Sequence, residues 1–167
     1  MSFSERQQVG GQTLVLNGVG FRKATIFKIQ VYAAGLYLLE PSSHSAQIIK
    51  SREPKKILLK FLRSVGVKDI REAWEKNLQF LCESSCAAIA PEVQKFLASL
   101  EGMEKGGEMS YVFTRTHFQL FVSGQLKMET PLGAFSETLL KTWLGPKLPP
   151  SVNEDLKEGL LKGGGLG

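Results

Sequence analysis

Cysteine and histidine are both scarce in this chain of 167 residues, which contains two of each. His44 and His117 lie in distant segments, and no second pair of ligands accompanies Cys82 and Cys86, so the sequence predicts no metal site. We also expect no cofactor. Because the two cysteines are four residues apart on a predicted helix, we expect packed thiols rather than a disulfide.

Long apolar runs are also missing, since none approaches the roughly 20 residues that span a bilayer. The first sixteen residues are too polar for a secretory signal. We therefore expect a soluble protein without a transmembrane segment. It would be periplasmic if an export signal has been removed from its N-terminus, and otherwise cytoplasmic.

The net charge of +5 comes from lysines and arginines scattered along the chain, and the densest run is Lys50 to Lys56. A basic surface stripe with interleaved aromatic residues, as nucleic-acid binding requires, is absent. We therefore interpret the basic run as a solvated loop and expect no nucleic-acid partner.

The overall composition, 43% hydrophobic and 22% charged, is typical of a globular protein. At this length we expect one domain over residues 1–167, with a core from about residue 12 to 162 and a flexible tail from 163 to 167.

Hydrophobic periodicity predicts an α+β domain in which helices pack on one face of an antiparallel sheet. The predicted strands are 13–16, 24–39, 55–62, 108–114, 118–122 and 125–129. The predicted helices are 42–50, 67–84, 91–100, 132–144 and 152–161. Proline is favoured in a first helical turn, which is why Pro91 marks the start of the third helix.

Carboxylates are locally absent as well, because none lies between Arg6 and Glu40. Within this stretch, Gly18 and Gly20 predict a turn that brings Arg22 into a long apolar strand. A guanidinium near the protein interior needs an anionic partner, and a ligand carboxylate or phenolate can provide it. The alternative is an ion pair with a carboxylate that is distant in sequence, such as Glu129 or Glu137.

Two further polar side chains lie on apolar helix faces. Asn77 lies within the apolar stripe of the helix over 67–84, and Thr142 shares a face with Leu132, Phe135 and Leu139. A buried amide left without a partner costs about 1–3 kcal/mol. Asn77 therefore bonds either to a neighbouring carbonyl or to a group in a cavity, and the hydroxyl of Thr142 either bonds the preceding turn or faces that cavity.

Three segments resemble the chalcone isomerase superfamily. They are LNGVGFRKATIFKIQVYAAGLYLLE from Leu16 to Glu40, KDIREAWEKNL from Lys68 to Leu78, and FSETLLKTWLG from Phe135 to Gly145. Their order and spacing cover most of residues 12–162, and the match is best to the chalcone isomerase-like proteins of bacteria. This resemblance implies the chalcone isomerase fold, an open-faced β-sandwich.

The resemblance also implies a ligand site. Arg22 matches the arginine of the plant isomerases, Asn77 their asparagine and Thr142 their late hydroxyl. Tyr32 and Ile70 replace a threonine and a tyrosine that are tied to isomerase chemistry. Arg22 and Tyr32 instead resemble the pair that holds the ligand carboxylate in the fatty-acid-binding branch of the superfamily.

The position of Tyr32 is ambiguous from the sequence. Strict alternation places it on the face of Lys28 and Gln30, opposite Phe27 and Val31. Tyr32 reaches an internal cleft only if that face turns inward or if a β-bulge resets the alternation, and otherwise it faces solvent.

The leading hypothesis is a non-catalytic protein that binds a small apolar carboxylate or phenolic ligand, such as a fatty acid. Arg22 would anchor the anion, Tyr32 would orient it, and Asn77 and Thr142 would line the polar end. The apolar walls would be Trp74, Phe135 and Trp143.

One alternative is an intramolecular lyase of the chalcone isomerase type, with Arg22 and Tyr32 as catalytic residues. Another is a scaffold that binds other proteins. The oligomeric state does not follow from the sequence.

Overall fold

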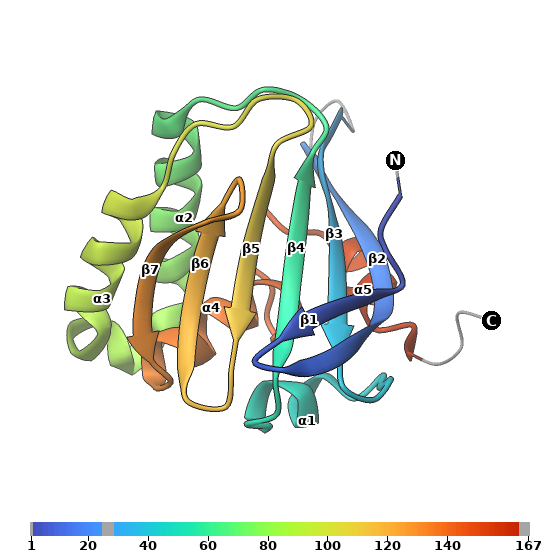
Figure 1. Cartoon of the computed structure of the whole chain (residues 1–167). Coiled ribbons are helices and arrows are strands. Elements are labelled where there is room, and N and C mark those ends of the chain that lie inside the picture. The colour runs from blue at the N-terminus through green and yellow to red at the C-terminus, as the bar shows by residue number, and fades with distance from the viewer. Residues whose placement is uncertain (1, 25–28, 164–167) are drawn as a thin grey trace.

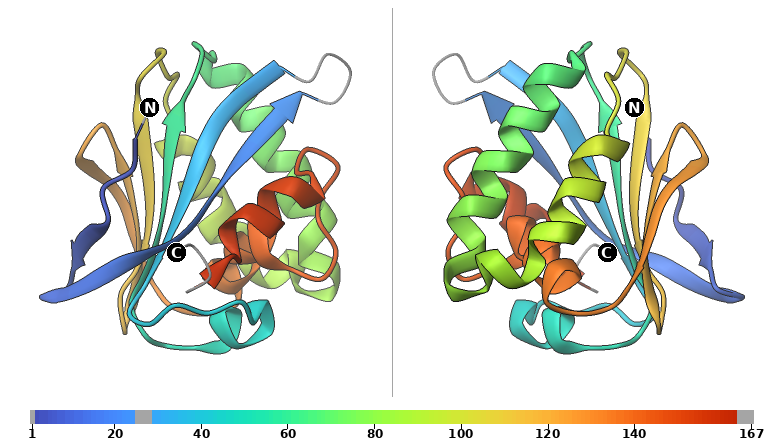
Figure 2. Two further views of the ribbon diagram at one scale, coloured as in Figure 1. Left: turned by 90° about the vertical axis from the view of Figure 1, so that its right-hand side faces the viewer. Right: turned by 90° about the vertical axis from the view of Figure 1, so that its left-hand side faces the viewer.

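The computed structural model describes residues 2–24 and 29–163. A seven-stranded antiparallel sheet forms its centre, and its strands follow one another in chain order from β1 to β7. Helices pack against one face of this sheet, as the two side views show (Figure 2). The predicted α+β architecture is therefore confirmed.

The strands are β1 Arg6–Val9, β2 Gln12–Ala24, β3 Ile29–Leu38, β4 Lys55–Phe61, β5 Glu108–Phe113, β6 His117–Val122 and β7 Gln125–Pro131 (Figure 1). The helices are α1 Ser45–Lys50, α2 Val67–Cys82, α3 Cys86–Ser99, α4 Ala134–Leu144 and α5 Glu154–Leu160, with a 3-10 turn over Glu83–Ser85. No helix in the described part of the chain has the length and apolar character needed to cross a membrane.

The main core lies between the sheet and the helices. Alternation along β3 places Tyr32, Ala34 and Leu36 on the helix side, where they join the side chains of α2, α3, α4 and α5. A second, smaller core lies on the other face of the sheet. It forms around Leu14, Tyr37 and Val112. On this second face, the backbone carbonyl of Ser4 accepts a hydrogen bond from the Tyr37 hydroxyl at 2.7 Å.

Gly18 and Gly20 do not form the predicted turn. Both lie inside strand β2, and helix α5 packs directly on them. A Cβ atom on Gly18 would collide with the backbone of Gly159 and Leu160, and one on Gly20 with the backbone of Leu156. Glycine is therefore needed here for close approach of two backbones. The prediction was wrong because the sequence does not reveal the neighbour.

Two β-bulges interrupt the pairing of β2 with β3. One falls at Asn17, whose buried amide bonds the carbonyls of Ser42 and Leu160 at 2.9 and 2.8 Å. At the other, Arg22 pairs with Tyr32 and Lys23 pairs with Gln30, which leaves Val31 as the extra residue. This second bulge is the reset of alternation that Tyr32 needed to face inward.

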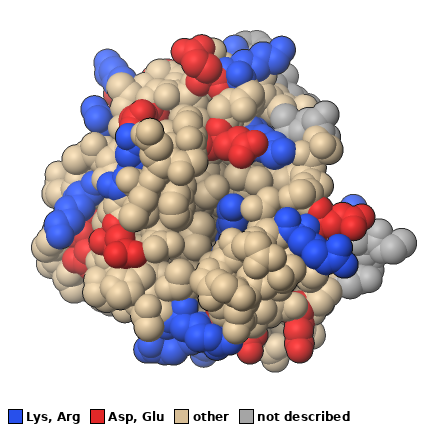
Figure 3. All heavy atoms as spheres, in the orientation of Figure 1, with Lys and Arg blue, Asp and Glu red and all other residues tan. Residues whose placement is uncertain are grey.

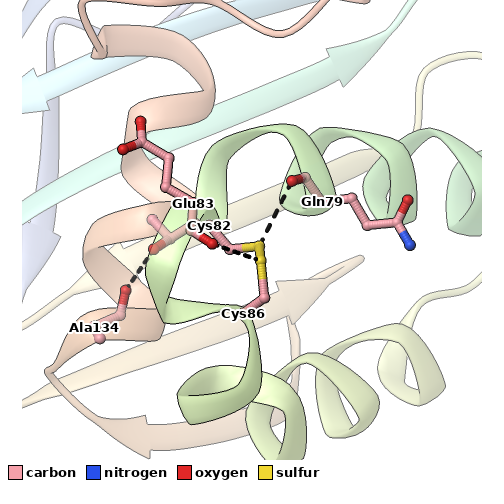
Figure 4. The surroundings of a disulfide bond; sticks show 6 residues. Gln79, Cys82, Glu83, Cys86 and Ala134 are labelled. Atoms are coloured by element: carbon pink, nitrogen blue, oxygen red, sulfur yellow. Dashed lines mark hydrogen bonds between the residues drawn. A yellow bond between two sulfur atoms is a disulfide. The ribbon is translucent and has the colours of Figure 1, made fainter.

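Cys82 and Cys86 form a disulfide, which contradicts the expected pair of free thiols (Figure 4). Helix α2 ends at Cys82, and Glu83 adopts a φ of 48° before the chain turns into α3. The two Cα atoms are therefore 4.9 Å apart, within the range that a disulfide spans. The prediction assumed one continuous helix through both cysteines.

Other boundaries also differ from the prediction. Helix α3 begins at Cys86, so Pro91 lies inside it instead of opening it. The predicted strand over 24–39 includes residues 25–28, which lie outside the described residues. The polar strand β1 was not predicted at all.

Charged side chains of both signs are interspersed on the face of the molecule seen in Figure 3. In the described residues, no group of three or more histidine, cysteine, aspartate or glutamate side chains could hold a metal ion.

Candidate ligand-binding site

A cavity of about 150 Å³ lies between the sheet and helix α2. Strands β2 to β5 form one wall, α2 forms the opposite wall, and Thr142 of α4 closes one side. The full lining is Arg22, Val31, Tyr32, Leu59, Phe61, Val65, Asp69, Ile70, Ala73, Trp74, Asn77, Met109, Tyr111 and Thr142.

Arg22 lies directly opposite Tyr32 in the β2–β3 pairing, so both side chains reach the cavity. Its Nε donates a hydrogen bond to the carbonyl of Ser151 at 3.0 Å. Within residues 2–24 and 29–163, no carboxylate forms an ion pair with it. The two terminal nitrogens of its guanidinium are therefore left to bind a ligand anion.

The predicted alternative partners of Arg22 are engaged elsewhere. Glu129 accepts a hydrogen bond from Gln119 at 2.6 Å, and Glu137 lies 3.9 Å from the ammonium of Lys141 on the same helix. Neither carboxylate lines the cavity.

Tyr32 is buried, which contradicts the solvent-facing alternative. Its hydroxyl oxygen accepts a hydrogen bond from Nε1 of Trp143 at 3.0 Å. Because an indole N–H can only donate, the phenolic hydrogen of Tyr32 remains available for an acceptor in the cavity. Burial raises the pKa of Tyr32, although the Trp143 bond and the charge of Arg22 oppose the rise. The side chain is therefore a neutral donor at physiological pH.

The hydroxyl of Thr142 is buried and has no hydrogen-bond partner among the described residues. One turn earlier, the hydroxyl of Thr138 donates to the carbonyl of Ala134 at 2.7 Å, four residues before it. Thr142 does not form the corresponding bond to the carbonyl four residues before it. A buried hydroxyl without a partner costs about 1–3 kcal/mol. Since Thr142 lines the cavity, a bound ligand is the group that would satisfy it.

Asn77 and Ser151 form a bridge at the edge of the cavity. The hydroxyl of Ser151 donates to Oδ1 of Asn77 at 2.6 Å, while the carbonyl of Ser151 accepts the bond from Arg22. The loop between α4 and α5 thus connects strand β2 to helix α2. Among the described residues, Nδ2 of Asn77 donates to no neighbouring carbonyl, and the amide is instead bonded to the protein through its oxygen, which accepts from Ser151.

The predicted apolar walls are placed only in part as expected. Trp74 lines the cavity. Trp143 stands behind it, with ring centroids 5.5 Å apart, and acts through its bond to Tyr32. Phe135 does not line the cavity and packs against Phe96, with ring centroids 5.6 Å apart. Phe135 is therefore a core residue.

Several lining residues were not predicted. Tyr111 packs on Trp143 with ring centroids 5.0 Å apart, and burial raises the pKa of its hydroxyl. Asp69 is the one carboxylate among the lining residues and lies exposed in the first turn of α2. Tyr111 lies on the same face of β5 as the apolar residues Met109 and Phe113, two positions away on either side, so strand periodicity could have found it.

A wider groove of about 670 Å³ adjoins the cavity and shares Arg22, Ala73 and Asn77 with it. Its remaining lining residues are Lys23, Lys76, Gln79, Phe80, Pro150 and Ser151. We call this hollow the outer groove.

Comparison with known proteins agrees with this fold. The family model described as chalcone isomerase-like matches residues 1–162. The chain belongs to the chalcone isomerase-like family. The crystal structure of a fatty-acid binding protein of Arabidopsis thaliana is similar to this family member, with a TM-score of 0.74 and 14% sequence identity. The match covers 97% of this chain and 94% of the plant protein. No curated protein sequence matches this chain significantly.

Proposed function

We propose that this chalcone isomerase-like protein binds a small apolar carboxylate, such as a fatty acid, without converting it. Three side chains direct hydrogen-bond donors at one cavity, and these donors lack an acceptor in the described residues: the two terminal nitrogens of Arg22, the hydroxyl of Tyr32 and the hydroxyl of Thr142. This convergence is the observation that carries the proposal.

A carboxylate fits these donors chemically. A planar guanidinium can donate two parallel bonds to the two carboxylate oxygens, and a phenol and an alcohol can each add one. Leu59, Phe61 and Trp74 form apolar walls for the adjoining carbon atoms. The fatty-acid binding activity named for the structurally similar Arabidopsis protein supports the same ligand class.

The first test is native mass spectrometry of the protein as purified from cells. We expect the wild-type protein to carry a bound acid and Arg22→Gln to lose it. Arg115→Gln is the matched control, because Arg115 is exposed at the turn between β5 and β6. An acid retained by Arg22→Gln would contradict the proposal.

Isomerase chemistry has less support. Raised pKa values keep Tyr32 and Tyr111 protonated near neutral pH, so neither supplies a phenolate base. A cavity of about 150 Å³ is also smaller than the roughly 300–1,000 Å³ of sites that enclose drug-sized ligands. We expect no acceleration of naringenin chalcone cyclisation over a buffer blank. Acceleration that requires Arg22 would assign the protein to the isomerases.

The compartment is proposed from the disulfide. Disulfides persist in oxidising compartments, so the Cys82–Cys86 bond favours the periplasm over the cytoplasm. A thiol-alkylating reagent should label neither cysteine in unreduced, denatured protein isolated from its native cells.

A further inference from the structure

The inner cavity is too small for a whole fatty acid. A cavity of 150 Å³ has room for about five water molecules at roughly 30 Å³ each, or for one benzene-sized molecule. A carboxylate and about three carbon atoms therefore fill it. The rings of Trp74, Tyr111 and Trp143 pack against one another with centroids 5.0–5.6 Å apart, which closes the core side.

The outer groove begins where the cavity ends. Arg22 and Asn77 line both hollows, so a ligand held by Arg22 lies at their boundary. The groove extends from there over Phe80, whose side chain is 45% exposed, and over Pro150. Phe80 and Leu126 are the two large hydrophobic residues exposed in the described part of the chain.

We propose that the ligand's hydrocarbon chain leaves the cavity and lies along the outer groove on Phe80, while its carboxylate stays inside with Tyr32 and Thr142. This inference rests on the proposed function and specifies the direction of the ligand. Only an acid longer than about four carbons reaches the outer groove, because a shorter acid fits in the cavity alone.

The cationic side chains of the groove are compatible with an alkyl chain. Lys23 and Lys76 can lay their aliphatic stems along the chain and keep their ammonium groups in water. Phe80 thereby gains an apolar contact that explains its exposure at this position. The bridge through Ser151 lies beside the exit from the cavity.

Chain-length dependence tests the proposal. We expect the dissociation constants of straight-chain acids from butanoate to decanoate, measured by calorimetry, to fall about two- to fourfold per added methylene, since each buried methylene is worth at most about fourfold. Phe80→Ser should reduce this increment and leave butanoate binding unchanged. Leu126→Ser is the matched control, because Leu126 is 50% exposed on β7 and outside both hollows.

A second measurement gives the direction of the chain independently. Trp74 and Trp143 are the only tryptophans, and a bromine atom in contact with such a ring quenches its fluorescence. We expect 2-bromooctanoate to quench more strongly than 8-bromooctanoate. Equal or stronger quenching by 8-bromooctanoate would place the tail in the core and overturn the proposal.

The two proposals fail in different ways. If the acids do not bind, or if Arg22→Gln binds them with the same affinity as the wild type, the proposed function is contradicted. If the acids bind through Arg22 but Phe80→Ser leaves the chain-length dependence unchanged, only the proposed outward direction of the hydrocarbon chain is contradicted.

Discussion

At the scale of single residues, the candidate site contains hydrogen-bond donors that have no acceptor in the described part of the chain. Arg22 is held in place through Nε, which orients the guanidinium, and its two terminal nitrogens have no acceptor within residues 2–24 and 29–163. Trp143 orients the Tyr32 hydroxyl in a similar way. Its indole N–H donates to the hydroxyl oxygen, so the hydroxyl hydrogen is still available for an acceptor in the cavity. The hydroxyl of Thr142 has no hydrogen-bond partner among the described residues, and in the proposed function a ligand supplies one.

Thr142→Val separates stability from binding. Valine has nearly the shape of threonine and removes a buried hydroxyl that has no partner among the described residues, so we expect the free energy of unfolding to increase by about 1 kcal/mol. The affinity for octanoate should fall at the same time. Thr138→Val is the control, because its hydroxyl is bonded to Ala134 and its loss should not stabilise the protein. Urea unfolding and calorimetry measure the two effects, and a destabilised Thr142→Val would contradict this reading.

Lys55 gives a residue-scale prediction outside the site. Burial lowers its pKa to about 8, and its Nζ donates to the carbonyls of Ser51 and Glu53 at 2.7 and 3.0 Å. Between pH 8 and the unfolded value of about 10.5, the folded protein has lost a proton that the unfolded chain keeps, so stability rises with pH. We expect the wild type to gain about 1–2 kcal/mol relative to Lys55→Met between pH 8 and 10. Urea unfolding at each pH checks this, and a constant difference would contradict it.

Several residues of the cavity lining were predictable from the sequence, because they carry local signals. Asn77 and Thr142 are polar positions on apolar helix faces, and Arg22 lies in a stretch without carboxylates. The wall position of Phe135 was wrong because periodicity shows that a side chain is buried and not what it contacts. Ser151 gave no signal, since a serine in a loop becomes specific only through the fold that brings it to Asn77.

At the scale of elements, close packing of α5 on β2 positions the loop that carries Ser151. Gly159 of the helix and Gly18 and Gly20 of the strand allow the two backbones to touch. The sequence shows these glycines plainly, but the same residues are typical of turns. Their structural role depends on contact with helix α5, about 140 residues later in the chain. The hydrogen bond from Asn17 to the carbonyl of Leu160 spans the same distance in sequence.

Substitution of these glycines tests the packing. We expect Gly18→Ala to destabilise the protein by about 3 kcal/mol or more, because the added methyl group meets helix backbone that cannot move aside. Gly66→Ala is the matched control, since a Cβ there meets no atom within 4 Å and φ is −69°. Because Gly66 is the N-cap of α2, where glycine is preferred to alanine, we expect Gly66→Ala to cost at most about 1 kcal/mol, well below the cost of Gly18→Ala. Thermal unfolding of both variants decides the matter, and equal effects would contradict the packing argument.

At the scale of the whole molecule, the sheet and helices enclose the main core, and the cavity beside Tyr32 and the adjoining outer groove lie at its α2 side. The order of elements was predictable because hydrophobic periodicity changes clearly between strand and helix along the chain. The edge strand β1 was missed because its sequence, RQQV, is short and mostly polar. The disulfide was missed because the end of α2 at Glu83 depends on a backbone conformation that glutamate rarely adopts.

We propose that the cavity binds an anion through Arg22 and its neighbours. The most direct measurement is calorimetric titration of the wild-type protein with octanoate and with its neutral counterpart octan-1-ol, repeated on Arg22→Gln. We predict that octanoate binds the wild type at least tenfold more tightly than octan-1-ol, and that Arg22→Gln abolishes this preference. Equal binding of the acid and the alcohol by the wild type would mean that the cavity recognises only the alkyl chain, and would contradict the account.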